Sequence, residues 1–376
     1  MNKTAIRLVT VGVVAGLAVA GCSSSKKSGD NGGGTTNTAT SGGGGGSFDV
    51  GVILPDTQTS PRWETQDRPS FEKAFKDAGL KADIQNAGGD TTKFVQIGDA
   101  MIQEGVKVII LTALDSSSGA QVESKAAAAG IKTIDYDRLV LGGADNYYIS
   151  FDNVKVGQLQ GQGLIDCLTA KGITNPSIIE IDGAPTDNNA TLFAQGYNSV
   201  LQPLYDAGTA KKLGEKAVDN WGAHGEAGPV FENLLTAAGG KVDGVLVAND
   251  SMAQQVLTIE QKHGISAPVT GQDASVEGLQ AVLSGKQCGT VFKDTNLEAP
   301  AASKLAIALI KGEDTSSMVN GTTKDSQTGK DVPSVLETPV WITPDKVKDV
   351  IAAGGQKASD VCTGDYAALC TQYGVS

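Results

Sequence analysis

The run VKVIILTAL at positions 106–114 is apolar at almost every residue. A strand with one face in water alternates apolar and polar residues, whereas a strand buried on both faces has a nearly continuous apolar run. Strands of the second kind occur in parallel sheets that helices cover on both sides. The run therefore predicts an α/β fold.

Strand-like runs and helical patterns alternate on both sides of this stretch. Helical patterns fall near 64–78, 91–104, 117–129, 154–170, 190–205 and 226–239. The strand-like runs are FDVGVILPD, LKADIQNA, KTIDYD, YYISFDN, SIIEIDGA, KLGEKAVD, DGVLVAND, PVTGQD and GTVFKD. This alternation predicts parallel sheets between helices. The part after position 47, about 330 residues, is long enough for two domains, so we expect two doubly wound, Rossmann-like lobes.

The first residues have the pattern of an export signal. Lys3 and Arg7 precede an apolar run of about 13 residues, which is shorter than the ~20 that a membrane-spanning helix needs. The run ends in Val-Ala-Gly-Cys, which resembles the lipobox of bacterial lipoproteins and implies a lipid on Cys22. We therefore predict a signal peptide at 1–21 and a disordered Gly/Ser-rich tether at 22–47 that is anchored to the membrane by its lipid.

The acidic balance, a formal net charge of −12, argues against nucleic acid and anionic membrane surfaces as partners. The sequence has no CxxC spacing and only two histidines, His224 and His263, so we expect no metal site. Outside the cytoplasm, the remaining four cysteines could form two disulfides in any of three pairings, or stay as buried free thiols. They are Cys167, Cys288, Cys362 and Cys370.

Polar side chains gather where the predicted strands end. In doubly wound sheets, ligands bind outside the carboxyl ends of the strands, where the helices begin. Asp and Asn at such positions are also good helix N-caps, so each has two possible interpretations. The strand-end residues are Asp56, Asp115, Asp137, Arg138, Asp152, Asn153, Asp187, Asn188, Asn189, Asn249, Asp250, Gln272, Asp273, Lys293 and Asp294.

The chemistry of this set favours a sugar as ligand. Arg62, Trp63 and Trp221 lie near helix starts, although aromatic residues make up only 5% of the chain. Sugar hydroxyls donate and accept hydrogen bonds, and a sugar ring presents a face of C–H groups. Carboxylates and amides match the hydroxyls, and flat indoles match the C–H face.

The sequence offers little for catalysis. It contains no GxSxG elbow, no P-loop and no GxGxxG at a strand end, and the Gly-Gln-Gly at 161–163 falls inside a predicted helix. A glycosidase needs only two carboxylates across a cleft, but nothing in the sequence singles out such a pair. We expect a binding protein that is not an enzyme and needs no cofactor.

Eight stretches resemble successive motifs of the xylose-binding periplasmic proteins of ABC sugar importers. They are PDTQTSPRWETQDR, TIDYDRLV, YYISFDNVKVGQLQ, GAPTDNNATLF, VDNW, VANDSMA, TGQDAS and VFKD. The resemblance runs from about Phe48 to Thr343, and the cysteine-bearing tail past Val350 lies outside it. It implies the type I periplasmic binding protein fold, in which a three-segment hinge joins the two lobes.

The resemblance also implies the ligand contacts. The tryptophans would pack on the sugar, and the polar residues would hold its hydroxyls. Asp115 is a possible additional contact, and Asn153 is expected to cap the helix after the first hinge crossing. The implied ligand-binding residues are Arg62, Trp63, Asp137, Arg138, Asp187, Asn189, Trp221, Asn249, Asp273 and Lys293.

The expected lobes are 48–152 plus 295–333, and 153–294 plus 334–376. A ligand held between them favours the closed form. The implied function is that of a monomeric, extracytoplasmic, lipid-anchored protein that delivers a monosaccharide to an ABC permease in the cytoplasmic membrane. D-xylose is the first choice of sugar.

Other functions remain open at this point. The chain could be a broader aldopyranose receptor for glucose, galactose or arabinose, used for transport or for presenting sugar to a membrane sensor kinase. A repressor-type sensor domain shares the fold, but it needs a helix-turn-helix head where this chain has a signal and a tether. A glycosidase is the last alternative.

Overall fold

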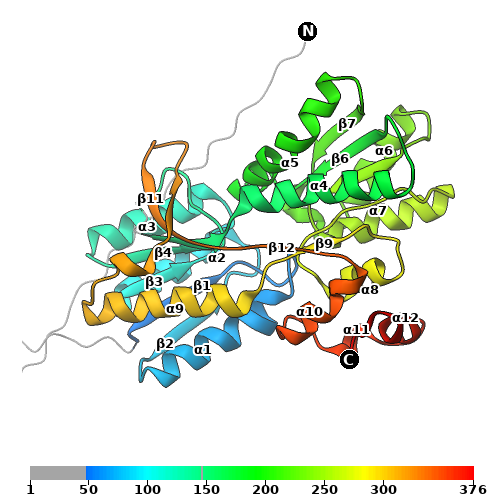
Figure 1. The fold of residues 1–376 in the computed structure, drawn as a ribbon. Coiled ribbons are helices and arrows are strands. Elements are labelled where there is room, and N and C mark those ends of the chain that lie inside the picture. The colour runs from blue at the N-terminus through cyan, green and yellow to red at the C-terminus, as the bar shows by residue number, and fades with distance from the viewer. Residues whose placement is uncertain (1–47, 145–146) are drawn as a thin grey trace, which may run out of the picture. The chain divides into compact units, whose positions relative to one another are not determined.

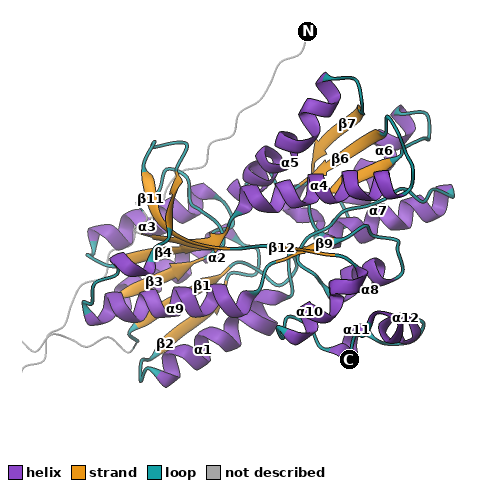
Figure 2. Cartoon of the chain, in the orientation of Figure 1, coloured by secondary structure: helices purple, strands orange, loops and turns teal. Residues whose placement is uncertain are grey.

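The computed structural model describes residues 48–144 and 147–376 (Figure 1). The predicted signal peptide at 1–21, the predicted tether at 22–47 and the predicted lipidation site Cys22 lie outside the described residues. Within the described ranges, no helix combines the length and the apolar character that crossing a membrane requires. The described chain forms two lobes, each built around its own sheet (Figure 2).

A seven-stranded sheet forms the first lobe. β1 (Val50–Leu54) lies beside β3 (Val108–Leu111), and every residue of both strands is buried, as the apolar run predicts. Neighbouring strands are parallel except for β10 and β11. The spatial order is β10 (Gly321–Lys324), β11 (Asp331–Glu337), β5 (Tyr147–Phe151), β4 (Lys132–Tyr136), β3, β1 and β2 (Ala82–Asn86).

Helices cover both faces of this sheet because successive residues of a strand point to opposite sides. Val52 of β1 shares a core with Phe71 and Leu305, whereas its neighbour Ile53 shares one with Phe94. The first core is covered by α1 (Arg68–Asp77) and α9 (Thr295–Lys311), and η3 (Ser316–Met318) follows α9. The second is covered by α2 (Thr91–Glu104) and α3 (Ser116–Ala128).

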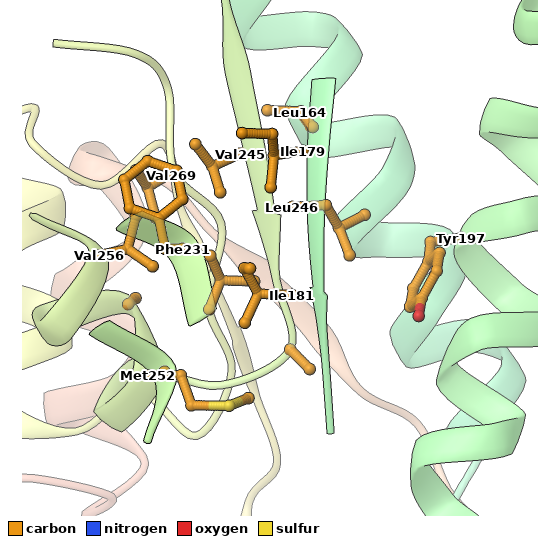
Figure 3. Packing of buried hydrophobic residues seen from close by; sticks show 14 of the residues in the cluster. Leu164, Ile179, Ile181, Tyr197, Phe231, Val245, Leu246, Met252, Val256 and Val269 are labelled. Carbon is orange, nitrogen blue, oxygen red and sulfur yellow. The ribbon is translucent and has the colours of Figure 1, made fainter. Parts of the chain in front are cut away.

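The second lobe is built on three parallel strands, β7 (Lys211–Ala217), β6 (Ser177–Asp182) and β8 (Gly244–Val247), in that order. Single bridges at Val269 and Gln287 continue beyond β8, and β9 (Thr290–Phe292) pairs with β12 (Val340–Ile342). Figure 3 shows the core, with Phe231 and Val256 on one side of the strands and Tyr197 on the other. The covering helices are α4 (Asn153–Ala170), α5 (Asn188–Asp206), α6 (Ala227–Ala237) and α7 (Asp250–His263).

Glycines bring α4 and α5 into backbone contact. A Cβ on Gly157 would lie 2.0 Å from the carbonyl oxygen of Phe193, and a Cβ on Gly196 would lie 2.1 Å from a carbonyl oxygen of α4. Gly161 faces the backbone of Tyr197 in the same contact. The glycines of this helix therefore serve helix packing rather than the binding of a phosphate.

Three chain segments connect the lobes. The first runs from β5 into α4, and the second runs from β9 into α9. The third follows Glu337, because β11 pairs with β5 from Ser334 to Glu337 inside the first sheet. The predicted lobe boundary after 333 is therefore wrong: it falls within β11, and residues 334–337 belong to the first lobe.

The C-terminal segment, residues 344–376, packs on α8 (Val276–Leu283) of the second lobe (Figure 1). Val350 and Val361 share a core with Leu279. Its elements are η4 (Pro344–Lys346), α10 (Val347–Ala352), α11 (Ala358–Val361) and α12 (Tyr366–Tyr373). The four cysteines form the disulfides Cys167–Cys288 and Cys362–Cys370, one of the three pairings that the sequence allows.

Candidate functional site

A pocket lies between the two lobes, where the carboxyl ends of their strands meet. We call it the central pocket; its cavity volume is about 30 Å³. The ten residues predicted to bind ligand all line it, although they come from both lobes and from distant loops. They are Arg62, Trp63, Asp137, Arg138, Asp187, Asn189, Trp221, Asn249, Asp273 and Lys293.

Four further residues complete the lining, and none of them is among the ten implied ligand contacts, although Gln272 is one of the strand-end residues. Thr59 and Ser60 stand just before the Pro-Arg-Trp motif, and Gln272 stands beside Asp273 at a strand end, so their neighbours carried a signal for all three. Phe193 lies in the second turn of α5. Its sequence context is that of any apolar residue on a buried helix face, so no pattern distinguished it.

Asp115, the possible additional contact, lies outside the central pocket. Its Oδ1 accepts a hydrogen bond from the backbone N–H of Ser118 at 2.7 Å, so it is the N-cap of α3. It lines a neighbouring cavity of about 320 Å³ on the side of His224. The helix-cap interpretation accounts for this residue.

Carboxylates hold Arg62 rigidly at one side of the central pocket. Its guanidinium lies 2.9 Å from Asp67 and 3.0 Å from Asp137, and it also pairs with Glu298 of α9. Burial by itself would lower the pKa of Arg62, but these carboxylates raise it well above its usual range. Burial also raises the pKa of Glu298 to about 8, despite the attraction of Arg62. Arg62 is therefore a fixed and permanently charged donor.

Asp137 joins this network from the end of β4. Its φ is 64°, a left-handed conformation that costs a non-glycine residue ~1–3 kcal/mol and persists only where its surroundings hold it. Its backbone N–H donates to the carbonyl of Ile149 at 2.8 Å. Burial opposes the charge on Asp137, yet Lys293, Arg62 and Arg138 together keep the pKa of its carboxyl below the usual value. The side chain is an ionised acceptor.

An ion pair joins the two lobes across the pocket. Nε of Arg138 in the first lobe lies 2.9 Å from Oδ2 of Asp187 in the second, and both residues are buried. Asp187 also accepts the backbone N–H of Asn189 at 2.9 Å, as N-cap of α5, and the indole N–H of Trp221 at 3.2 Å. Burial raises the pKa of Asp187, and Arg138 opposes that rise. Such a buried pair between lobes defines a closed arrangement.

Two indole rings face the pocket from opposite lobes. Trp63 begins η1 (Trp63–Asp67), and the guanidinium of Arg62 lies 4.5 Å from its ring centre. Trp221 lies in η2 (Asp219–Gly222) with its ring edge-on to Phe193, the centres 6.0 Å apart. These contacts fix both rings before any ligand arrives, and their faces suit the C–H surface of a sugar.

Several polar groups in the pocket keep unused hydrogen-bonding capacity. Nζ of Lys293 lies 3.7 Å from Asp137 and 3.6 Å from Asp273, beyond hydrogen-bond distance of either. Oε1 of Gln272 is buried with no partner among the described residues. Asn249 uses its Oδ1 to cap α7, which leaves its amide N–H groups for the pocket. A ligand that both donates and accepts hydrogen bonds would satisfy these groups.

The motif YISFDN leads from β5 into the first hinge segment. Oδ1 of Asp152 accepts the backbone N–H of Lys155 at 2.9 Å, so Asp152 is the N-cap of α4. The prediction that Asn153 caps this helix is therefore wrong, because Asn153 is already its first residue and its side chain is buried.

Asn153 instead belongs to a network that we call the hinge network: Tyr148, Asn153 and Asn189. Nδ2 of Asn153 donates to the Tyr148 hydroxyl at 3.0 Å and to Oδ1 of Asn189 at 2.9 Å. The Tyr148 hydroxyl and Nδ2 of Asn189 both donate to the carbonyl oxygen of Asp137, at 3.0 and 2.8 Å. The network thus links the first lobe, the hinge and the second lobe at the pocket wall.

One carboxylate cluster lies apart from the pocket. The ligand atoms of Glu180, Asp182 and Glu215 lie within 4.8 Å of one another in the second lobe. Lys212 lies 2.8 Å from Glu180 and 2.7 Å from Glu215, and the Tyr197 hydroxyl donates to Asp182. These partners account for the cluster, which gives no support for a metal.

Comparisons with known proteins agree on the family. Residues 50–314 match the model of the periplasmic binding protein domain. The chain is 34% identical over 319 residues to the D-xylose-binding periplasmic protein of Escherichia coli (strain K12), covering 83% of this chain and 92% of that protein. It is 33% identical over 326 residues to the multiple sugar-binding periplasmic receptor ChvE of Rhizobium radiobacter, covering 83% and 91%.

Solved structures give the same result. An ABC transporter solute binding protein from Clostridium phytofermentans with bound β-D-glucose is 31% identical to this chain, with a TM-score of 0.75. The match covers 83% of this chain and 99% of that protein. The α/β prediction of parallel sheets in two lobes is confirmed, as is the prediction that the chain is not an enzyme. The chain belongs to the periplasmic binding protein family and has its type I fold.

Proposed function

We propose that this chain is the extracytoplasmic substrate-binding component of an ABC sugar importer and that it binds one monosaccharide in the central pocket. The observation that carries the proposal is the composition of the pocket. Two fixed indoles, ionised acceptors such as Asp137 and incompletely bonded donors such as Lys293 line one pocket. Sugar-binding relatives of similar length support it.

D-xylose is the proposed sugar. A relative whose name specifies D-xylose is 34% identical. The alternative is a broader aldopyranose receptor, for transport or for a membrane sensor kinase. This alternative is supported by a multiple sugar-binding receptor that is 33% identical to this chain and by a glucose-bound structure that is 31% identical to it.

Binding would proceed by closure of the lobes. A cavity of about 30 Å³ is far smaller than the ~300–1,000 Å³ of small-molecule sites, so the lobes would have to part and close again around a sugar. A sugar bonded to residues of both lobes stabilises the closed form over the open one. The Arg138–Asp187 pair and the bond from Asn189 to the Asp137 carbonyl cross between the lobes, so closure would add these protein contacts.

The proposed lipid on Cys22 would keep the receptor near its permease, which raises its effective concentration without any new contact. Mass spectrometry of the membrane-extracted protein tests this part. A diacylglycerol-modified N-terminal cysteine supports it, and an unmodified Cys22 in the membrane fraction contradicts it.

The sugar is tested by a thermal-shift screen of the part of the chain from Phe48 to Ser376, whose described residues belong to one compact unit. The screen contains D-xylose, D-glucose, D-galactose, L-arabinose, D-ribose and myo-inositol. A ligand at a hundred times its Kd adds ~2.7 kcal/mol of stabilisation, which raises the midpoint clearly. A shift with D-xylose alone supports the first choice, and shifts with several aldopyranoses support the alternative. No shift with any sugar contradicts the proposed function.

A further inference from the structure

A second cavity adjoins the central pocket on the side of the C-terminal segment. Its volume is about 420 Å³, compared with about 30 Å³ for the central pocket. Ser60, Arg62, Asp273 and Lys293 line both cavities, so the two spaces meet at these four side chains. We call the larger space the side chamber.

Three parts of the fold build the walls of the side chamber. Thr65 and Gln66 come from the first lobe, Val276 comes from the start of α8 in the second lobe, and Gly355 and Lys357 come from the C-terminal segment. That segment lies beyond residues 50–314, which match the family model. One wall is therefore made by a part of this chain outside the matched domain.

Hydrogen bonds fix this wall against both lobes. Nε2 of Gln66 donates to the carbonyl oxygen of Gly355 at 2.8 Å, and the Thr295 hydroxyl donates to Oε1 of Gln66 at 2.7 Å. On the other side, Nε2 of Gln280 in α8 donates to the carbonyl oxygen of Val361 at 3.0 Å. The side chamber therefore has a defined shape in the closed form.

The lining of the side chamber combines polar and apolar groups. Thr65 and Ser275 present hydroxyl groups, and Lys357 and Glu277 present exposed charges. Val276 adds an apolar surface beside them. Its volume lies within the ~300–1,000 Å³ of small-molecule sites. Polar groups mixed with apolar surface suit a second sugar ring.

The junction between the cavities has the donors that a glycosidic linkage requires. A linking oxygen between two sugar units accepts hydrogen bonds but has no hydrogen to donate. Lys293 stands at the junction with its ammonium beyond hydrogen-bond distance of Asp137 and Asp273. It can therefore donate to a linking oxygen, while Asp273 accepts a hydroxyl of either sugar unit.

We propose that the side chamber holds a second sugar unit, so that the protein also binds a disaccharide. Its first pyranose occupies the central pocket, and its linking oxygen lies beside Lys293. This inference rests on the proposed function, because it assigns the first unit to the monosaccharide site.

Isothermal titration of the full chain with the best monosaccharide of the screen, and with its α- and β-linked disaccharides, tests the inference. At least one disaccharide is expected to bind within tenfold of the monosaccharide Kd. Val276→Trp fills the chamber from the second lobe and Thr65→Trp fills it from the first. Each should raise the disaccharide Kd tenfold or more and leave the monosaccharide Kd within twofold, and Val276→Ala is the matched control for Val276→Trp.

The possible outcomes separate the two proposals. A monosaccharide that binds while every disaccharide is rejected overturns the second unit and leaves the proposed function standing. Disaccharide binding that neither tryptophan variant weakens also overturns it, because the second unit then lies elsewhere. If no sugar binds, the proposed function itself fails. Thermal unfolding of each variant identifies a misfolded protein, and the other variant then decides.

Discussion

At the scale of single residues, the central pocket depends on side chains whose bonds within the protein are incomplete. Asp273 is one such residue: its side chain is 21% exposed, and Lys293 is its ion-pair partner at 3.6 Å. Its φ of 95° is left-handed, and its backbone N–H donates to the carbonyl of Val291 at 2.8 Å. Asp273 lines the central pocket, where we propose that its carboxylate contributes to sugar binding more than to folding.

Asp273→Asn should therefore weaken sugar binding with little change in the free energy of unfolding. A hydrogen bond to a charged group is worth ~1.5–3 kcal/mol, so the Kd should rise by about ten- to a hundredfold. Titration calorimetry and urea unfolding measure the two quantities. Asp115→Asn is the control, because Asp115 is also a strand-end carboxylate but caps α3 outside the pocket. Equal affinity in Asp273→Asn and wild type would refute the assignment of Asp273.

The hinge network predicts a kinetic effect. Tyr148→Phe removes the hydroxyl that donates to the Asp137 carbonyl and accepts from Asn153. The same hydroxyl lies 3.2 Å from Oδ1 of Asn189 in the second lobe, so its loss removes a contact between the lobes, and we expect faster sugar dissociation, up to about tenfold for one neutral hydrogen bond, with the association rate nearly unchanged. Stopped-flow fluorescence measures both rates. Tyr147→Phe is the matched control, since the Tyr147 hydroxyl bonds Thr315 instead. Identical dissociation rates in the two variants would argue against a role in closure.

Position and resemblance together selected residues that share one pocket. Strand ends, helix starts and motif resemblance gave ten residues, and all of them line the central pocket, while their contact with a sugar stays a prediction. The same rule selected Asp115, because a carboxylate at a strand end serves equally well as a ligand contact or a helix cap. Asn153 was assigned as a cap, since the sequence does not reveal which of two adjacent polar residues begins the helix.

At the scale of elements, the contact between α4 and α5 depends on glycine. A Cβ at position 196 would lie 2.1 Å from the carbonyl oxygen of Val154, and backbone atoms cannot move aside cheaply. Gly196→Ala should therefore destabilise the protein by ~1–3 kcal/mol, the usual cost of overpacking. Urea unfolding of the sugar-free protein measures the change.

Gly228→Ala in α6 is the control for this substitution. The nearest atoms to its added Cβ would lie 3.9 Å away, so the methyl group fits. Alanine in a helix at a compatible site usually stabilises a protein by ~0.4–1 kcal/mol, because it restricts the unfolded chain. The two substitutions should thus change the free energy of unfolding in opposite directions. A neutral Gly196→Ala would mean that the helices move apart at little cost.

Element prediction was strong for buried strands and weak for exposed ones. The runs that become β1 and β3 are apolar because both faces are covered. β10 has the sequence GTTK and is mostly exposed, so it lacks the regular spacing of apolar residues that identifies a strand. Its pairing with β11 extends the first sheet as an antiparallel edge. The expected lobe boundary after 333 falls inside β11, because the last residues of β11 pair with β5 as far as Glu337.

At the scale of the whole molecule, buried carboxyl groups couple folding to pH. Burial raises the pKa of Asp182, Asp250 and Glu260 to about 7 and that of Glu298 to about 8. The folded protein therefore binds protons at a pH where the unfolded chain has released them. At a pH below these folded pKa values, protonation of the buried carboxyl groups stabilises the folded state. This contribution is lost as the pH rises through the folded pKa values.

The unfolding temperature of the sugar-free protein should therefore fall as the pH rises from about 5 to 8, as measured by differential scanning calorimetry. Glu260→Gln removes one of these titrating groups and keeps the side-chain shape, so the unfolding temperature should fall less steeply with pH than in wild type. Because Glu260 does not line the central pocket, sugar affinity should stay unchanged. Glu313→Gln, at an exposed position, should retain the wild-type slope. An unfolding temperature that rises over this range, or a Glu260→Gln slope equal to that of wild type, would show that the burial of these carboxyls does not control stability.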